Sequence, residues 1–285
     1  MSPWSAQEDR RIRDQEKKAA LEEIRSNIGK GKLSRTVFFV PGWTDEFSTC
    51  WMNPYLPYST YVPIKRHVAR LYQNYDLCSF VTFSARDSRS CKSFIDFGKI
   101  LKEKIRKVPG GLKSFDVVGH SMGGLDTIAA ILDESDPLEG VNYFITAATP
   151  HRGSFWGDAC KIPIVQKRRK LKPHQIIQGE NLDPDHKPIQ YINRVDNRAR
   201  FLKSIKRLYC LGGTRDTAVF SSSYFDTTGL TPDLQAKVEL VERYDGARHA
   251  GAGGITQDPR CMRDVLRVLM GKPLDRPQFN YGKVS

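Results

Sequence analysis

Short apolar runs alternate with stretches of helical periodicity along most of the chain. Six runs of four to seven residues predict strands, at residues 37–40, 78–83, 115–118, 143–147, 207–211 and 238–244. Between them, apolar residues recur at every third or fourth position and predict helices, at residues 68–72, 94–108, 125–132 and 262–269. Because most strand-like runs are apolar at consecutive positions, we expect both faces of these strands to be buried. The pattern predicts an α/β fold: a mostly parallel central sheet with helices on both faces, and function at the carboxyl ends of the strands.

The N-terminal stretch departs from that rhythm. Residues 5–32 are highly charged, with Leu21, Ile24 and Ile28 at helical spacing and glycines immediately after them. This pattern predicts a surface helix with a narrow apolar stripe. We expect residues 1–32 to form an arm that packs on the body of the protein, with a functional tail as the alternative.

A second departure lies between two predicted strands. Residues 151–205 are polar and very basic, and five of the seven residues in 166–172 are lysine or arginine. We interpret this stretch as an insertion in a domain that spans residues 33–285. Insertions of this size in α/β enzymes are often lids over the active site, and a plain surface excursion is the alternative.

Composition and charge narrow the class of protein. The 285 residues are 39% hydrophobic and 27% charged, which is typical of globular proteins and excludes a disordered chain. No run approaches the ~18 apolar residues of a membrane span. The first 18 residues contain no apolar segment typical of a secretory signal, and the six cysteines form no C-x-x-C pair. We therefore expect reduced thiols and a cytoplasmic location, with peripheral contact to membranes as an addition.

The surplus of basic residues is large. There are 45 lysines and arginines against 32 aspartates and glutamates, a formal net charge of +13. Such a charge suggests nucleic acid or an anionic membrane as a partner, and it does not distinguish between the two. Much of it lies in the N-terminal stretch and the insertion. We interpret it as a docking face for anionic lipid or another acidic partner, or else as a solubilising surface, and we expect no specific binding of nucleic acid.

The strongest motif is Gly119-His-Ser-Met-Gly-Gly124, which follows a predicted strand and precedes a predicted helix. So tight a turn holds Ser121 in a strained backbone conformation and presents its hydroxyl above the sheet. The amide of Met122 then lies at a helix N-terminus, where it can stabilise an oxyanion. We predict that Ser121 is a nucleophile; a glycine-rich turn with a solvated serine is the alternative.

A serine nucleophile needs a base, and an oriented imidazole is the usual one. His249 follows the last predicted strand by five residues, in the glycine-rich loop 246–254, and is the predicted base. His120 adjoins the serine and is interpreted as structural. Three further histidines have no obvious partner in the sequence, namely His67, His174 and His186.

The carboxylate that orients the imidazole is expected just after the strand that precedes the last one. Asp216 follows residues 207–211 by five positions, the same offset as that of the predicted base, which brings both to one edge of the sheet. Asp226 and Asp245 are alternatives. The chain order of serine, then aspartate, then histidine is that of α/β-hydrolases, and it differs from the orders in chymotrypsin-like and subtilisin-like proteases.

A second oxyanion donor is expected at the end of the first strand. That strand runs into Pro41-Gly42-Trp43, and a glycine there allows the backbone to approach the substrate closely. We predict that the amide of Trp43 is this donor, paired with that of Met122. A simple turn at Pro41-Gly42 is the alternative.

These motifs resemble the lipase/esterase branch of the α/β-hydrolases, especially triacylglycerol lipases and GPI-inositol-deacylase-like proteins. The matching elements lie within residues 33–270 and are Phe39–Trp43, Gly119–Gly124, Ala148–Ser154, Gly213–Val219 and His249. The resemblance implies that Thr149, Pro150 and His151 shape the pocket and that His151 is not the base. This chain departs from the family in having Pro41-Gly42 where His-Gly is frequent. It also lacks the hydrophobic lid of secreted lipases, which weighs against bulk fat as a substrate.

The sequence therefore predicts a serine hydrolase of lipid metabolism that cleaves a small-molecule or lipid carboxylic ester through an acyl-enzyme. Trp43, Phe155 and Trp156 adjoin the motifs and are the expected substrate-binding residues. No metal or cofactor motif is present, neither H-E-x-x-H nor G-x-x-x-x-G-K-[ST]. The alternatives are an amidase or acyltransferase with the same residues, a catalytically silent binding module, and a nucleic-acid-binding protein.

Overall fold

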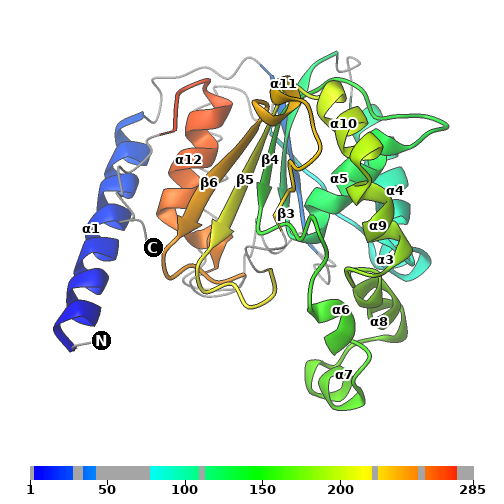
Figure 1. Cartoon of the computed structure of the whole chain (residues 1–285), viewed down its shortest axis with the longest axis horizontal. Coiled ribbons are helices and arrows are strands. Elements are labelled where there is room, and N and C mark those ends of the chain that lie inside the picture. The colour runs from blue at the N-terminus through cyan, green and yellow to red at the C-terminus, as the bar shows by residue number, and fades with distance from the viewer. Residues whose placement is uncertain are drawn as a thin grey trace.

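The computed structural model describes residues 3–27, 35–42, 78–108, 113–219, 224–249 and 254–274. Six parallel strands form one sheet in the order β2-β1-β3-β4-β5-β6. Their bounds are β1 Thr36–Val40, β2 Cys78–Phe80, β3 Phe115–His120, β4 Val141–Ala147, β5 Arg207–Gly213 and β6 Val238–Tyr244. The expected α/β fold with a parallel sheet is confirmed (Figure 1). The helix expected at residues 68–72 lies outside the described residues.

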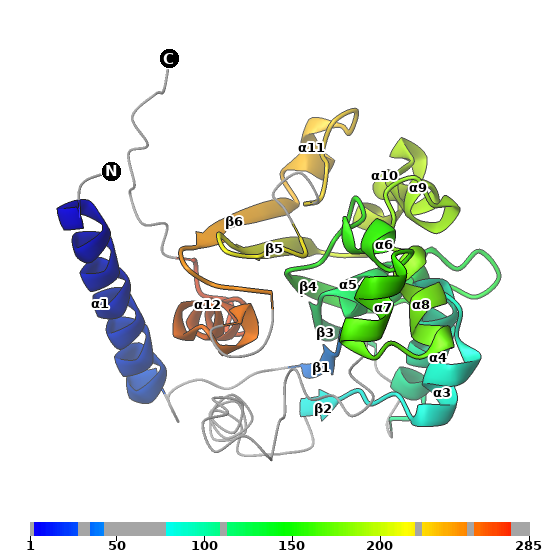
Figure 2. The ribbon, with the colours of Figure 1, turned by 90° about the horizontal axis from the view of Figure 1, so that it is seen from below.

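Helices cover both faces of this sheet, as Figure 2 shows. On one face lie α4 (Phe94–Arg106) and α5 (Met122–Leu132), and on the other lies α12 (Pro259–Leu269). Successive residues of β1 point to opposite faces, so that Phe38 packs in the cluster with α4 and α5 whereas Phe39 packs in the cluster with α12. Both side chains are fully buried, which explains why the strand is apolar at each position from Val37 to Val40.

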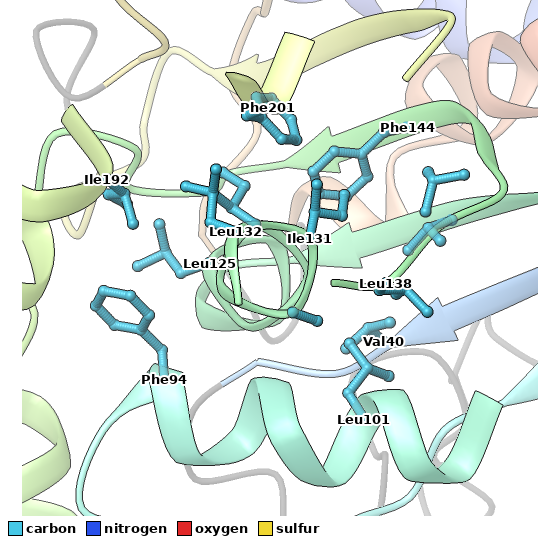
Figure 3. Packing of buried hydrophobic residues seen from close by; sticks show 14 of the residues in the cluster. Val40, Phe94, Leu101, Leu125, Ile131, Leu132, Leu138, Phe144, Ile192 and Phe201 are labelled. Atoms are coloured by element: carbon cyan, nitrogen blue, oxygen red, sulfur yellow. The ribbon is translucent and has the colours of Figure 1, made fainter. Parts of the chain in front are cut away.

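The larger of the two clusters joins the sheet to α4, α5 and the segment between β4 and β5 (Figure 3). Leu125 and Leu132 of α5 lie at its centre, between Leu101 of α4 and Phe201 of that segment. All four side chains are buried. Because α5 begins directly after Ser121, this packing holds the turn that carries the serine.

The N-terminal helix α1 (Pro3–Asn27) packs along α12, outside the sheet. Its contacts combine buried Ala20 and Ile24 with two ion pairs to arginines of α12. Glu16 lies 2.8 Å from Arg260, and Glu23 lies 2.6 Å from Arg267. The charged pattern of α1 thus fits a helix that uses a narrow apolar stripe and flanking carboxylates for packing.

The segment between β4 and β5 folds into short helices. They are α6 Trp156–Ala159, α7 Pro163–Arg169, α8 Pro173–Glu180, α9 Lys187–Asn193 and α10 Val195–Ser204. The described residues also form α3 Ala85–Ser90, α11 Pro232–Gln235 and the 3₁₀ turn Ile255–Gln257. Among the described residues, the helices include none with the length and apolar character needed to cross a bilayer.

Candidate active site

Ser121 lies in the sharp turn between β3 and α5. Its backbone has φ 52° and ψ −127°, a conformation that non-glycine residues rarely adopt. The amide of Ser121 donates to the carbonyl of Ala147 in the neighbouring strand, at 2.9 Å. The strained turn is thus held by the sheet on one side and by α5 on the other.

The end of β1 approaches this turn very closely. A Cβ atom at Gly42 would lie 2.9 Å from Cβ of Ser121 and 3.1 Å from Nδ1 of His120. No side chain fits into such a gap, so that the close approach requires glycine at this position. The predicted oxyanion donor Trp43 is the next residue and lies outside the described residues.

His249 lies between the serine and a carboxylate. The hydroxyl of Ser121 lies 2.9 Å from Nε2 of His249, and Nδ1 of the same ring lies 2.9 Å from Oδ2 of Asp216. Because a carboxylate only accepts hydrogen bonds, Nδ1 carries the proton and Nε2 offers its lone pair to the serine. The structure therefore brings together the three residues that the sequence singled out.

Asp216 is held by its own loop. Its Oδ1 accepts hydrogen bonds from the amides of Ala218 and Val219, both at 2.8 Å, which leaves Oδ2 directed at His249. The side chain is almost completely buried, so that these bonds substitute for water around the charge.

The two alternative acids have other partners. Asp245 pairs with Arg13 of α1 at 2.6 Å. Asp226 pairs with Arg198 of α10 at 3.1 Å. Neither contacts His249, so that Asp216 is the aspartate that meets the imidazole.

His120 has a role that the sequence did not reveal. Its Nε2 lies 3.0 Å from the carbonyl oxygen of His249 and donates to it, and the two rings lie 5.1 Å apart. Burial, together with the nearby His249, lowers the pKa of His120 to about 3. The ring is therefore neutral at pH 7 and supports the backbone of the loop that carries His249. Only its position next to Ser121 hints at this contact in the sequence.

The other predicted residues lie around these three. Met122 is buried and is the first residue of α5, where the amide has no partner within the helix. Phe155 and Trp156 lie at the start of α6 with their rings 6.1 Å apart; Phe155 is 54% exposed and Trp156 is half-buried. The hydroxyl of Ser154 donates to the carbonyl of Ala218, which ties the start of α6 to the Asp216 loop.

The contacts of His151 are with residues other than the serine. Its Nε2 is 3.1 Å from Oγ1 of Thr146 and 3.7 Å from Sγ of Cys210, and its ring packs edge-on against Phe225. Burial lowers the pKa of His151 to about 3. No cluster of three or more metal-ligating side chains occurs in the described part of the chain.

Comparison of the sequence with family models and with curated proteins gives no match. The structure, however, is similar to solved lipases. The mature form of Bacillus licheniformis lipase BlEst2 superposes with a TM-score of 0.58 and 16% identity, over 84% of this chain and 93% of that one. Phospholipase PlaB from Legionella pneumophila gives 0.58 and 13%, over 82% and 58%. Aspergillus fumigatus lipase B gives 0.54 and 14%, over 82% and 52%. The similarity shows an α/β-hydrolase fold.

Proposed function

We propose that this chain, which has the α/β-hydrolase fold seen in lipases and esterases, is a serine hydrolase that cleaves carboxylic esters. The observation that carries the proposal is the continuous hydrogen-bonded chain from the Ser121 hydroxyl through His249 to Asp216, with both distances at 2.9 Å. A serine hydroxyl becomes a nucleophile when a base accepts its proton as it attacks.

The reaction begins when Oγ of Ser121 attacks the ester carbonyl carbon and His249 Nε2 takes the hydroxyl proton. Asp216 then stabilises the imidazolium. The negative charge that develops on the carbonyl oxygen is stabilised by the amides of Met122 and Trp43. Collapse of this intermediate expels the alcohol, which receives the proton from His249, and leaves an acyl group on Ser121. Water, activated by the same imidazole, releases the acid.

Three supporting observations come from the surroundings of the serine. The strained backbone of Ser121 is typical of a nucleophile at a strand-to-helix turn. The Met122 amide lies at the start of a helix, where the dipole favours negative charge. Gly42 lets the end of β1 reach the serine, which supports the proposal that the amide of the following residue is the second donor.

Hydrolysis of aryl esters of increasing chain length tests the proposal. Wild type is expected to turn over at least one of them and to react with a fluorophosphonate, whereas Ser121→Ala loses about a thousandfold or more in kcat. Ser204→Ala is the matched control, because that exposed hydroxyl on α10 donates to the Arg200 carbonyl of the same helix. Full turnover by Ser121→Ala would contradict the proposal, as would an inert wild type. Added alcohol separates acyl transfer from hydrolysis by the product formed.

A further inference from the structure

The segment 155–172 carries an unusual surface. It contains α6 and α7, and we call it the α6–α7 tip. Seven large hydrophobic side chains are exposed among the described residues, namely Ile12, Phe155, Ile162, Ile164, Ile177, Val195 and Leu240. Three of the seven lie in this tip. Exposed apolar groups that lie close together along the chain, unlike single scattered ones, are typical of interaction sites.

The same tip is strongly basic. Residues 161–172 contain six lysines and arginines and no acidic residue. Lys161 is neutralised by Asp158 and Asp183, at 3.0 and 2.5 Å. Lys167 and Lys170 are exposed and form no ion pair with any residue that the structure describes. The tip therefore presents uncompensated positive charge next to aliphatic side chains.

The two kinds of side chain follow each other along the tip. Ile162 and Ile164 lie at the start of α7 and are 47% and 58% exposed. Lys167 and Lys170 lie at the end of the same helix. Aliphatic groups that enter the boundary of a bilayer, with lysines that reach its headgroups, are the two requirements of binding to an anionic lipid surface. Exposed isoleucines add nothing to contact with a nucleic-acid backbone, which calls for charge alone.

The position of the tip relates it to the candidate active site. The tip leaves the sheet just after the carboxyl end of β4, and α6 and α7 extend beyond that edge in Figure 1. At its base, Ser154 bonds to Ala218, whose amide bonds to Asp216. A surface bound to the tip would thus lie on the side of the sheet where Ser121 is presented.

We propose that the α6–α7 tip docks the protein on the surface of an anionic phospholipid bilayer, with Ile162 and Ile164 in the interface and Lys167 and Lys170 at the headgroups. This inference rests on the proposed function in one respect: docking is useful because it brings a lipid ester to the candidate active site. The binding itself requires no turnover. It is therefore tested separately, with the full chain carrying Ser121→Ala.

The experiment is co-sedimentation with vesicles of phosphatidylcholine alone or mixed with phosphatidylserine. Binding is expected only to the mixed vesicles and is expected to weaken as salt rises. The pair Lys167→Glu and Lys170→Glu is expected to weaken binding at least about tenfold, as is the pair Ile162→Ser and Ile164→Ser.

Matched controls come from α9 and α10, which also lie between β4 and β5. Lys187→Glu with Lys203→Glu makes the same charge change on α9 and α10, and Val195→Ser removes an equally exposed aliphatic group on α10. These variants are expected to bind as the parent does. Turnover of a soluble short-chain ester, measured on the same substitutions in the active chain, reports folding.

Several outcomes would overturn the docking proposal: no binding to mixed vesicles, equal binding to both vesicle types, or equal losses in tip and control variants. Binding of a DNA duplex that needs the tip lysines, with no vesicle binding, would assign the surface to nucleic acid instead. Vesicle binding by a chain that hydrolyses no ester would support docking and contradict the proposed function, so that the two failures are distinguishable.

Discussion

Arg13 of the N-terminal helix donates to Oδ2 of Asp245, at 2.6 Å. Asp245 lies four residues before His249, and its Oδ1 accepts a hydrogen bond from the hydroxyl of Thr214, at 3.0 Å. Thr214 in turn lies two residues before Asp216. One carboxylate therefore links α1 to the loops that carry the acid and the imidazole of the candidate site.

Removal of this link is expected to loosen both loops. Replacing Arg13 by alanine should lower kcat by about threefold to tenfold, the effect of an interaction worth roughly 1 kcal/mol, and should leave KM unchanged. The Arg13 side chain is 20% exposed and that of Asp245 is 51% exposed, so that solvent screens the pair in part and the expected effect is modest. The measurement is steady-state turnover of a soluble short-chain ester.

Arg11→Ala is the control for that change. Arg11 pairs with Glu8 on the exposed side of the same helix, where both side chains are more than half exposed. It should leave turnover unchanged, and Arg13→Lys should restore part of the lost rate. Equal losses in Arg11→Ala and Arg13→Ala would mean that α1 acts only through overall stability.

Gly42 is expected to tolerate no side chain. In Gly42→Ala the new methyl group would contact Ser121 Cβ at 2.9 Å, so that the serine or the end of β1 must move. A displacement of about 1 Å in an active site costs on the order of a hundredfold in rate. We therefore expect kcat to fall by one to two orders of magnitude while the melting temperature falls only slightly.

Gly271→Ala provides the comparison. Gly271 follows α12 with φ 67°, and a Cβ atom there would meet nothing within 4 Å. Its positive φ makes alanine cost about 1 kcal/mol of stability, but the residue lies outside the candidate site. This variant should melt earlier and keep its kcat. The opposite result, a stable but slow Gly271→Ala, would contradict the assignment.

Asp126 of α5 is fully buried, and neither of its carboxylate oxygens has a hydrogen-bond partner among the described residues. Burial raises the pKa of this carboxyl well above its usual value. The folded protein thus holds a proton that the unfolded chain releases, and stability is lost as the pH rises towards the folded-state pKa. Asp126→Asn removes this loss.

Urea unfolding at several pH values measures the effect. Near pH 4 the free energies of unfolding should be similar, and at pH 8 Asp126→Asn should be the more stable by about 1 kcal/mol or more, since one pKa unit corresponds to ~1.4 kcal/mol. Asp116→Asn is the control, and it is expected to lower the free energy of unfolding at pH 8. The reason is that Asp116 accepts hydrogen bonds from Arg35, Asn142 and the Tyr143 amide. Destabilisation of both variants at pH 8 would rule out an unpaired carboxyl at Asp126.

The sheet, and the positions of Ser121, Asp216 and His249 at its edge, could be predicted from the sequence for a physical reason. Strands buried on both faces must be apolar at successive positions, and parallel strands bring their carboxyl ends to one edge. A loop residue a few positions after a strand, such as Asp216 or His249, is therefore placed by the strand. The Ser121 turn is specified locally by its glycines.

Other features depend on contacts between distant residues. The helices between β4 and β5 have four to ten residues each, too few to establish a periodic pattern. The contact of His120 with the His249 carbonyl, and that of Arg13 with Asp245, join residues 129 and 232 positions apart. No local pattern encodes such pairs, since they arise only when the fold brings the elements together.

The packing of α1 on α12 also sets an order of events as the chain is made. Glu16 meets Arg260, 244 positions later, and Ser121 meets His249, 128 positions later. Synthesis proceeds from the N-terminus, so that α1 leaves the ribosome well before α12 and finds its partner only when α12 is complete. Contacts of such long sequence separation form slowly. Until then Ile24 lacks the helix against which it is buried in the folded protein, and apolar surface of this kind is what makes incomplete chains prone to aggregate.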